Sequence, residues 1–127
     1  MEIQVGMRGQ AETVVTTQNT ADSVGSGLLP VFATPSMIAL MEEAAVKALN
    51  LEGTASSVGI AIDIRHLAAT PLAMKVWAEA EVIEVDRRRV VFNVFAYDER
   101  EKIGEGRHER FLIDSEQFMR KVAGKRV

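Results

Sequence analysis

The chain has 127 residues, of which 47% are hydrophobic and 26% charged, so residues 1–127 are expected to form a single folded domain. It has no cysteine, which excludes disulfides, thiolate metal sites and a cysteine nucleophile, and a cytoplasmic location is expected. The net charge of -3 argues against a nucleic-acid partner, and no basic leader or apolar run of about 18 residues predicts a membrane segment. Small molecules are the expected partners.

The first part of the chain predicts a strand, a loop and one long helix. Residues 8–18 include the β-branched run 13–17, which favours a strand. The small and polar residues 19–27 predict a loop with one helical turn. Thr34 is predicted to cap a helix that has Pro35 at its first position and runs to Leu49, and residues 50–53 end it with an asparagine and a glycine.

After Gly53 the hydrophobic period changes from 3.6 to 2, which predicts strands joined by short polar turns. The final residues, 114–127, predict a capped short helix and a basic tail. The predicted strands cover residues 57–67, 72–85, 90–97 and 102–113.

This order of elements predicts an α+β fold in which an antiparallel sheet of about five strands wraps around one central helix. Alanines on the helix would let the sheet approach closely. A sheet edge would remain open, so two copies are expected to pair edge to edge as a homodimer, and pairing of dimers into tetramers stays open. The alanines concerned are Ala39, Ala44, Ala45 and Ala48.

Glu42 lies at the apolar side of the predicted helix, and no basic side chain follows or precedes it by three or four residues. Its neighbour Glu43, in contrast, precedes Lys47 by four residues and is expected to form an exposed ion pair. Burial without a cation raises the pKa of a carboxyl group, which suits a general base or acid near neutral pH. The alternative is that Glu42 sits at the boundary of the apolar face and reaches water.

His66 continues an apolar face of its predicted strand, whereas Gly59 is expected on the opposite face. The imidazole is therefore a candidate for proton transfer, and a structural hydrogen-bonded histidine is the alternative. His108 shares its side of a later strand with glycines, which have no side chain and so do not indicate whether that side is buried. It is therefore a weaker candidate than His66. Two distant histidines do not predict a metal site. The residues ahead of His66 on its face are Val58, Ile60, Ile62 and Ile64.

Thr34 is a third candidate, because a capping hydroxyl still has a proton to donate beside the positive end of the helix dipole. Capping alone is the alternative. The three candidates are found within a wider set of motifs. The set comprises Val31-Phe32-Ala33-Thr34, Met41-Glu42, Gly59 seven residues before His66, Ala68-Ala69-Thr70-Pro71, and Gly104-Glu105-Gly106-Arg107-His108-Glu109-Arg110.

With these motifs the chain resembles the hotdog-fold thioesterases, specifically the branch that is similar to fluoroacetyl-CoA thioesterase, from about Thr13 to Val122. The resemblance implies that Thr34, Glu42 and His66 act together on an acyl-CoA thioester. It implies that Glu42 attacks the carbonyl carbon or activates water, that Thr34 orients the reacting groups, and that His66 assists proton transfer.

The resemblance also implies binding roles. The backbone N–H of Gly59 matches a position that stabilises the carbonyl oxygen as it becomes negative. Arg110 matches a residue near the acyl pocket, and its alternative is a structural pair with an acid. Leu28 and Phe32 are expected to contact substrate. The fluoroacetyl-specific enzyme carries two phenylalanines before the threonine where this chain has Gly25 and Leu28, so the resemblance does not extend to an aromatic gate.

The sequence therefore predicts hydrolysis of an acyl-CoA or acyl-carrier thioester with an unidentified acyl group. Coenzyme A would enter as part of the substrate, without a metal or another cofactor. One alternative is an acyl-CoA hydratase or dehydratase, since a carboxylate and an imidazole can also move protons beside a thioester. Another is a non-catalytic dimer that binds acyl-CoA. Thiol release, enoyl absorbance and recovery of intact ligand distinguish the three.

Overall fold

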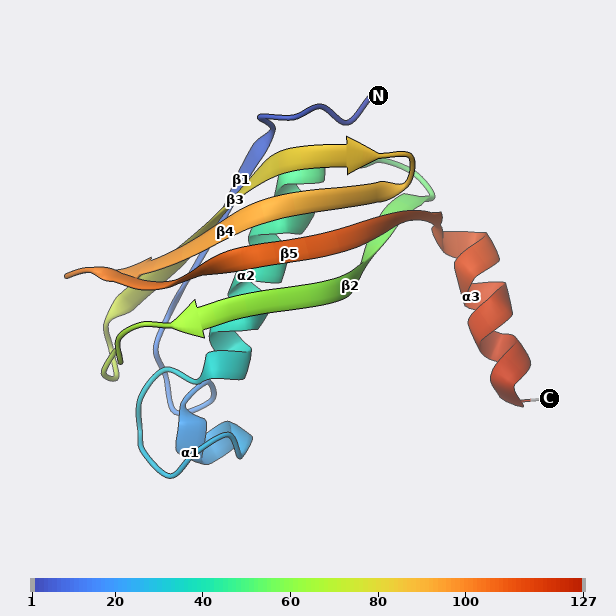
Figure 1. Cartoon of the computed structure of the whole chain (residues 1–127). Coiled ribbons are helices and arrows are strands. Elements are labelled where there is room, and N and C mark those ends of the chain that lie inside the picture. The colour runs from blue at the N-terminus through green and yellow to red at the C-terminus, as the bar shows by residue number, and fades with distance from the viewer. Residues whose placement is uncertain (1, 127) are drawn as a thin grey trace.

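A computed structural model describes residues 2–126, in which one curled antiparallel sheet wraps around a long helix (Figure 1). The long helix crosses the inner side of the sheet, and a shorter helix leaves the sheet near the C-terminus. In chain order the elements are β1 (Arg8–Val14), α1 (Ala21–Val24), α2 (Thr34–Leu49), β2 (Ala55–His66), β3 (Lys75–Asp86), β4 (Arg89–Asp98), β5 (Lys102–Asp114), α3 (Ser115–Ala123) and a 3-10 turn (Gly124–Arg126).

The five strands follow the spatial order β1-β3-β4-β5-β2, and every neighbouring pair is antiparallel. Two hairpins connect β3, β4 and β5, as the polar turns predict. The strands β1 and β2 form the two edges of the sheet. This arrangement confirms the predicted α+β fold of about five strands around one central helix.

The core lies between α2 and the inner face of the sheet. The apolar face of α2 includes Met37, Met41 and Leu49, which are fully buried. β1 crosses the helix so closely that a Cβ atom at Gly9 would overlap the backbone of Ala44 and Ala48. A glycine on the strand and alanines on the helix therefore set the close approach of the two elements, as the sequence predicts for the alanines.

The predicted cap at the start of α2 is wrong in its details. Ala33 is the N-cap, Thr34 is the first helical residue, and Pro35 follows it. The Thr34 hydroxyl makes no cap hydrogen bond and is therefore free to bond elsewhere. The C-terminal end follows the prediction, because Asn50 adopts the left-handed conformation with φ 49°.

β1 is shorter than the predicted segment. The strand ends at Val14, and Asn19 holds the following turn with its side chain: its Oδ1 accepts from the Thr16 N–H at 2.9 Å and its Nδ2 donates to the Val14 carbonyl at 3.1 Å. The single helical turn predicted within residues 19–27 is α1.

β2 contains a β-bulge that changes which of its residues face α2. Gly59 is opposite Arg110 and Ala61 is opposite Glu109, so Ile60 is the extra residue. The bulge shifts the alternation by one position, and Gly59 and His66 therefore face the same side. The prediction that Val58 and Ile60 continue the inner face ahead of His66, with Gly59 opposite, is wrong for this reason.

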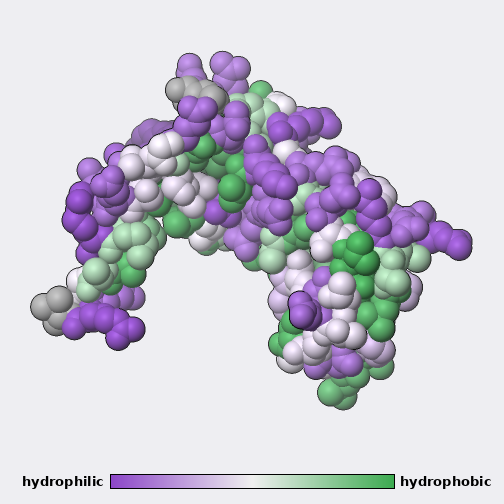
Figure 2. All heavy atoms as spheres, turned by 180° about the vertical axis from the view of Figure 1, so that it is seen from behind, coloured by the Kyte–Doolittle hydropathy of each residue, from purple (hydrophilic) through white to green (hydrophobic). Residues whose placement is uncertain are grey.

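α3 begins at Ser115, and its N-cap Asp114 accepts from the Gln117 N–H at 3.1 Å through its side chain, as predicted for a capped C-terminal helix. In the space-filling view the molecule is hollowed between α3 on one side and the lobe of α1 and its loops on the other (Figure 2). Across residues 2–126, every helix is too short or too polar to cross a bilayer.

Candidate active site

The start of α2 and the end of β2 meet at a threonine–histidine pair. Thr34 Oγ1 lies 2.7 Å from His66 Nδ1, so the hydroxyl predicted to cap the helix instead bonds the imidazole. Nε2 of His66 is buried and has no hydrogen-bond partner within the described chain. The pair borders a hollow of about 390 Å³, which Phe32 and Ala68 also line. One ring nitrogen of His66 is therefore held by Thr34, and the other is buried at the border of the hollow without a hydrogen-bond partner among residues 2–126.

Burial lowers the pKa of His66 below its usual value of 6.5, against a smaller opposite effect of the Ala68 backbone. The imidazole is thus neutral at pH 7. A neutral imidazole can accept a proton at one nitrogen and release one from the other. This geometry suits the proton transfer expected of His66.

Glu42 lies farther along α2, in a second group of polar side chains. Its Oε2 is 3.3 Å from Nη1 of Arg110 and 3.9 Å from Nε2 of His108, and its side chain is 41% exposed. The expectation of a buried carboxylate without a cation is therefore wrong, and the alternative that Glu42 reaches water from the boundary of the apolar face is met, with a cation that comes from β5 and not from the helix itself. The predicted surface pair of Glu43 and Lys47 is confirmed at 3.1 Å.

The backbone of Gly59 lies directly beside the Glu42 carboxylate. A Cβ atom at Gly59 would lie 2.6 Å from Glu42 Oε2 and 3.2 Å from Cε1 of His108. Any side chain here would displace the carboxylate. The absence of a side chain therefore lets Glu42 lie directly over the backbone of β2, beside the bulge.

The expectation that Arg110 pairs with an acid is met by Glu42 itself. His108, ranked low from the sequence, is fully buried between Arg110 and the bulge. The neighbouring glycines hid this burial: a Cβ atom at Gly104 would meet Met37, and one at Gly106 would meet the backbone of Asp63. A glycine in a sequence does not show that its surroundings are tightly packed, so the burial of His108 could not be predicted from its neighbours.

The two groups are separate within one chain. Glu42 follows Thr34 by eight residues, which corresponds to about 12 Å of helix rise. Among residues 2–126, no hydrogen bond or ion pair joins Glu42 to Thr34 or His66. The structure thus brings Thr34 to His66 and Glu42 to Gly59 and Arg110, without bringing the two groups into contact.

The segment before Thr34 lines the hollow beside His66 with Ala21, Ser26, Val31 and Phe32, but not with Gly25 or Leu28. Leu28 is 93% exposed, and nothing lies within 4 Å of a Cβ atom added at Gly25. Phe32 is buried and lines the hollow. Of the two expected substrate contacts, only Phe32 therefore borders the site within the chain.

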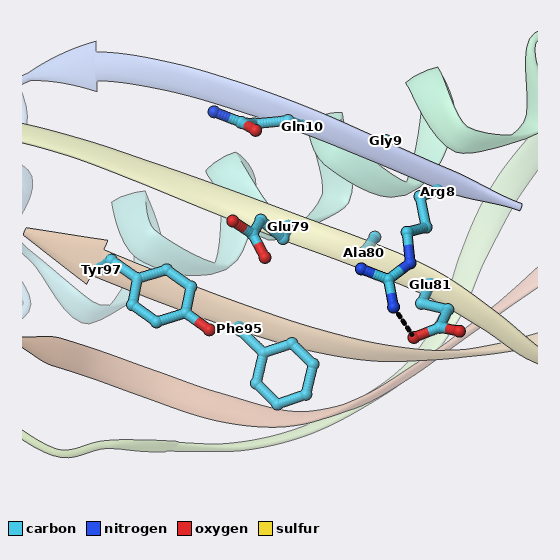
Figure 3. Close-up of a pocket in the computed structure, with 8 residues that line it drawn as sticks. All are labelled: Arg8, Gly9, Gln10, Glu79, Ala80, Glu81, Phe95 and Tyr97. Atoms are coloured by element: carbon cyan, nitrogen blue, oxygen red, sulfur yellow. Dashed lines mark hydrogen bonds and ion pairs between the residues drawn. The ribbon is translucent and has the colours of Figure 1, made fainter. Parts of the chain in front are cut away.

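A larger hollow of about 610 Å³ lies on the outer face of the sheet (Figure 3). It contains none of the predicted site residues, and α2 is behind the strands in this view. Its most polar contact joins Arg8 and Glu81 at 3.1 Å, with the arginine side chain 71% exposed. The candidate residues Thr34, His66 and Glu42 all lie away from this hollow, so the candidate site is the inner face.

We expect the free energy of unfolding to decrease as the pH is lowered from 7 to 5.5. Burial lowers the pKa of His66, and burial followed by the charge of Arg110 lowers that of His108. Unfolded histidines take up protons near pH 6.5, so the stabilisation is complete above that pH and is lost as the pH falls toward the folded pKa values. Urea unfolding at both pH values measures this, and a flat or opposite dependence would contradict it.

The chain resembles known proteins over most of its length. The family model described as fluoroacetyl-CoA-specific thioesterase matches residues 15–116. A fluoroacetyl-CoA thioesterase of Streptantibioticus cattleyicolor is 44% identical over 97 residues, which make up 75% of this chain and 70% of that protein. A solved structure of the fluoroacetyl-CoA thioesterase FlK is 37% identical, with a TM-score of 0.91 over 98% of both chains. A thioesterase superfamily member from Thermus thermophilus is 31% identical, with a TM-score of 0.84 over 98% of this chain and 96% of that one. These likenesses confirm the predicted hotdog fold.

Proposed function

The chain belongs to the family of fluoroacetyl-CoA-specific thioesterases, and from this we propose that it hydrolyses acyl-CoA thioesters with Glu42, His66 and Thr34. The observation that carries the proposal is the Glu42 carboxylate, which lies over the Gly59 backbone with Arg110 as its counter-ion. A carboxylate beside a bare stretch of backbone can activate a nucleophile where a carbonyl group approaches.

In the proposed reaction, a water oxygen bonds to the thioester carbonyl carbon while Glu42 takes the proton of that water. The Gly59 N–H donates to the carbonyl oxygen as it becomes negative. The carbon–sulfur bond then breaks, and His66 passes a proton to the departing sulfur while the proton taken up by Glu42 returns to His66, so both side chains regain their starting state and a carboxylic acid and free coenzyme A leave. Thr34 fixes the ring through Nδ1. Direct attack by Glu42 is the other route, and both routes need its ionised form.

We propose that the protein is a homodimer formed along the free edge of β2. Within residues 2–126, β2 pairs with β5 on one side and with no strand on the other. Ile60 and Ile62 are 52% and 38% exposed on this edge strand, which is an apolar surface that a second copy would cover. The edge lies between α3 and the lobe of α1, where the surface is hollowed (Figures 1 and 2).

A dimer of this kind would also complete the site. In an antiparallel pair of identical strands, residues equally far from the two-fold axis lie opposite each other. An axis midway between Gly59 and His66 would place the Thr34–His66 pair of one copy beside Glu42 of the other. The separation of the two groups within one chain supports this shared site.

The substrate in this proposal is a coenzyme A thioester with a small acyl group. Solved structures of the related FlK enzyme include complexes with fluoroacetate and CoA and with acetyl-CoA. The hollow beside His66 measures about 390 Å³ and carries no aromatic gate at Gly25 or Leu28. The proposal includes no metal or further cofactor. The cytoplasmic location remains a prediction from composition.

We expect purified protein to release free thiol from short acyl-CoA esters, measured with a thiol-reactive dye against a panel of short, medium and aromatic acyl groups. Crotonyl-CoA is the informative member, because a hydratase would remove its enoyl absorbance without releasing thiol. Recovery of every ester intact after tight binding would contradict hydrolysis and favour a binding dimer.

A further inference from the structure

The guanidinium group of Arg110 is held from three sides. Its Nε donates to Ser57 Oγ at 2.8 Å and its Nη2 donates to the Ser57 carbonyl at 3.1 Å. Its Nη1 donates to His108 Nε2 at 3.1 Å and to Glu42 Oε2 at 3.3 Å. Ser57 and His108 thus fix the plane of the guanidinium, and the Glu42 contact is the one that faces the proposed reaction site.

The direction of each hydrogen bond in this chain of contacts is determined. A guanidinium group can only donate, so His108 Nε2 must accept and must carry no proton. A carbonyl oxygen can only accept, so His108 Nδ1, which lies 2.8 Å from the Ala61 carbonyl, must carry the proton. His108 is therefore a neutral imidazole protonated on Nδ1. A proton on Nε2 would turn this acceptor into a donor facing Nη1 and break the contact.

The β-bulge connects this network to the strand that supports the site. It brings the Ala61 carbonyl to Nδ1 of His108 and leaves Gly59 facing Glu42. His108 also packs against Phe92 with ring centroids 6.0 Å apart. Its ring is therefore fixed by a hydrogen bond at each nitrogen and by packing on one face.

From these contacts we infer that His108 and Ser57 are positioning residues, which aim Arg110 so that it holds the Glu42 carboxylate over Gly59. The inference rests on the proposed role of Glu42 and extends it to two residues that do not touch substrate. A displacement of about 1 Å at a reacting group can reduce the rate about a hundredfold. The network therefore acts on kcat and not on substrate binding.

The test compares His108→Leu with His108→Gln. Both lose the bond to the Ala61 carbonyl, but only glutamine keeps an acceptor for Arg110. We expect His108→Leu to lower kcat about 10- to 100-fold with KM within about twofold. We expect kcat of His108→Gln to lie between those of His108→Leu and the wild-type protein, with most of the loss recovered. Melting temperatures should decrease similarly in both. Equal kcat values in the two folded variants would overturn the inference.

Two further measurements cover a variant that fails to fold. Ser57→Ala removes only the acceptor for Nε and should also lower kcat with little change in KM, whereas an unchanged kcat would overturn the role of Ser57. In an Arg110→Met background, His108→Leu should have no additional effect on kcat, because its action passes through Arg110. A full additional loss there would contradict the inference.

A measurement without substrate separates this inference from the proposed function. A long-range ¹H–¹⁵N correlation spectrum of the wild-type protein at pH 7 should show His108 protonated on Nδ1 only. Protonation on Nε2 would overturn the positioning network, whether or not the protein hydrolyses thioesters. The expected spectrum together with no thiol release from any ester would instead count against the proposed function alone.

Discussion

Glu42→Gln is expected to lower kcat/KM for thioester hydrolysis by about 10²- to 10⁴-fold, the range that a positioned acid–base group contributes. Glutamine has nearly the same size and its amide oxygen can still accept from Arg110 Nη1, which lies 3.3 Å from Oε2. It can neither take a proton from water nor attack the carbonyl carbon. The decrease in kcat/KM would therefore result from the missing carboxylate and not from a rearrangement of the site. Steady-state thiol release measures it.

Glu43→Gln is the matched control, because it removes the adjacent carboxylate of the same helix. Glu43 forms an exposed pair with Lys47, in which the two side chains are 53% and 55% exposed. Such a pair contributes about 0.3–0.5 kcal/mol, so the control should keep its activity and nearly all its stability. A Glu42→Gln variant with activity within about twofold of this control would remove Glu42 from the mechanism.

Much of the fold could be predicted because local chemistry determines it. The period of 3.6 before residue 50 and the period of 2 after Gly53 predicted α2 and the four later strands. Asn50 marked the end of α2 because it tolerates the left-handed conformation, and Asp114 marked the start of α3 because its side chain can cap a helix. The small residues of α2 indicated how closely the sheet would approach. These features depend on short stretches of chain, which is why the sequence predicts them.

The errors arose where a distant part of the chain decides the outcome. The bulge at Ile60 is invisible to a period-2 pattern, yet it moves Gly59 to the face of His66. The Thr34 hydroxyl has the chemistry of a cap but is bonded by His66, 32 residues away in the sequence. Arg110 neutralises a carboxylate on another element. Each case depends on a tertiary contact that competes with the local preference.

Mixing two inactive variants should restore activity if the site is shared between subunits. In a mixed dimer of Glu42→Ala and His66→Ala chains, one site combines the intact Glu42 of one copy with the intact His66 of the other, and the second site lacks both. Random exchange makes about half of the dimers mixed, each with one working site, so about a quarter of the wild-type activity should return. Thiol release after the variants are unfolded together and refolded measures this recovery.

The same experiment distinguishes the shared site from a site within one chain. If Glu42 and His66 of a single copy acted together, every chain in the mixture would lack one of them, and activity would stay at the level of the separate variants. The control is a mixture of Glu42→Ala with Glu42→Gln, which has no complementary pair and should stay inactive. The mixture must also run at about 28 kDa in sedimentation, twice the 13.9 kDa of one chain. Thr34 and His66 of one chain are bonded to each other, so Thr34→Ala should complement Glu42→Ala in the same way. A mixture of Thr34→Ala with His66→Ala should stay inactive, because Thr34 and His66 act in one site and come from the same copy.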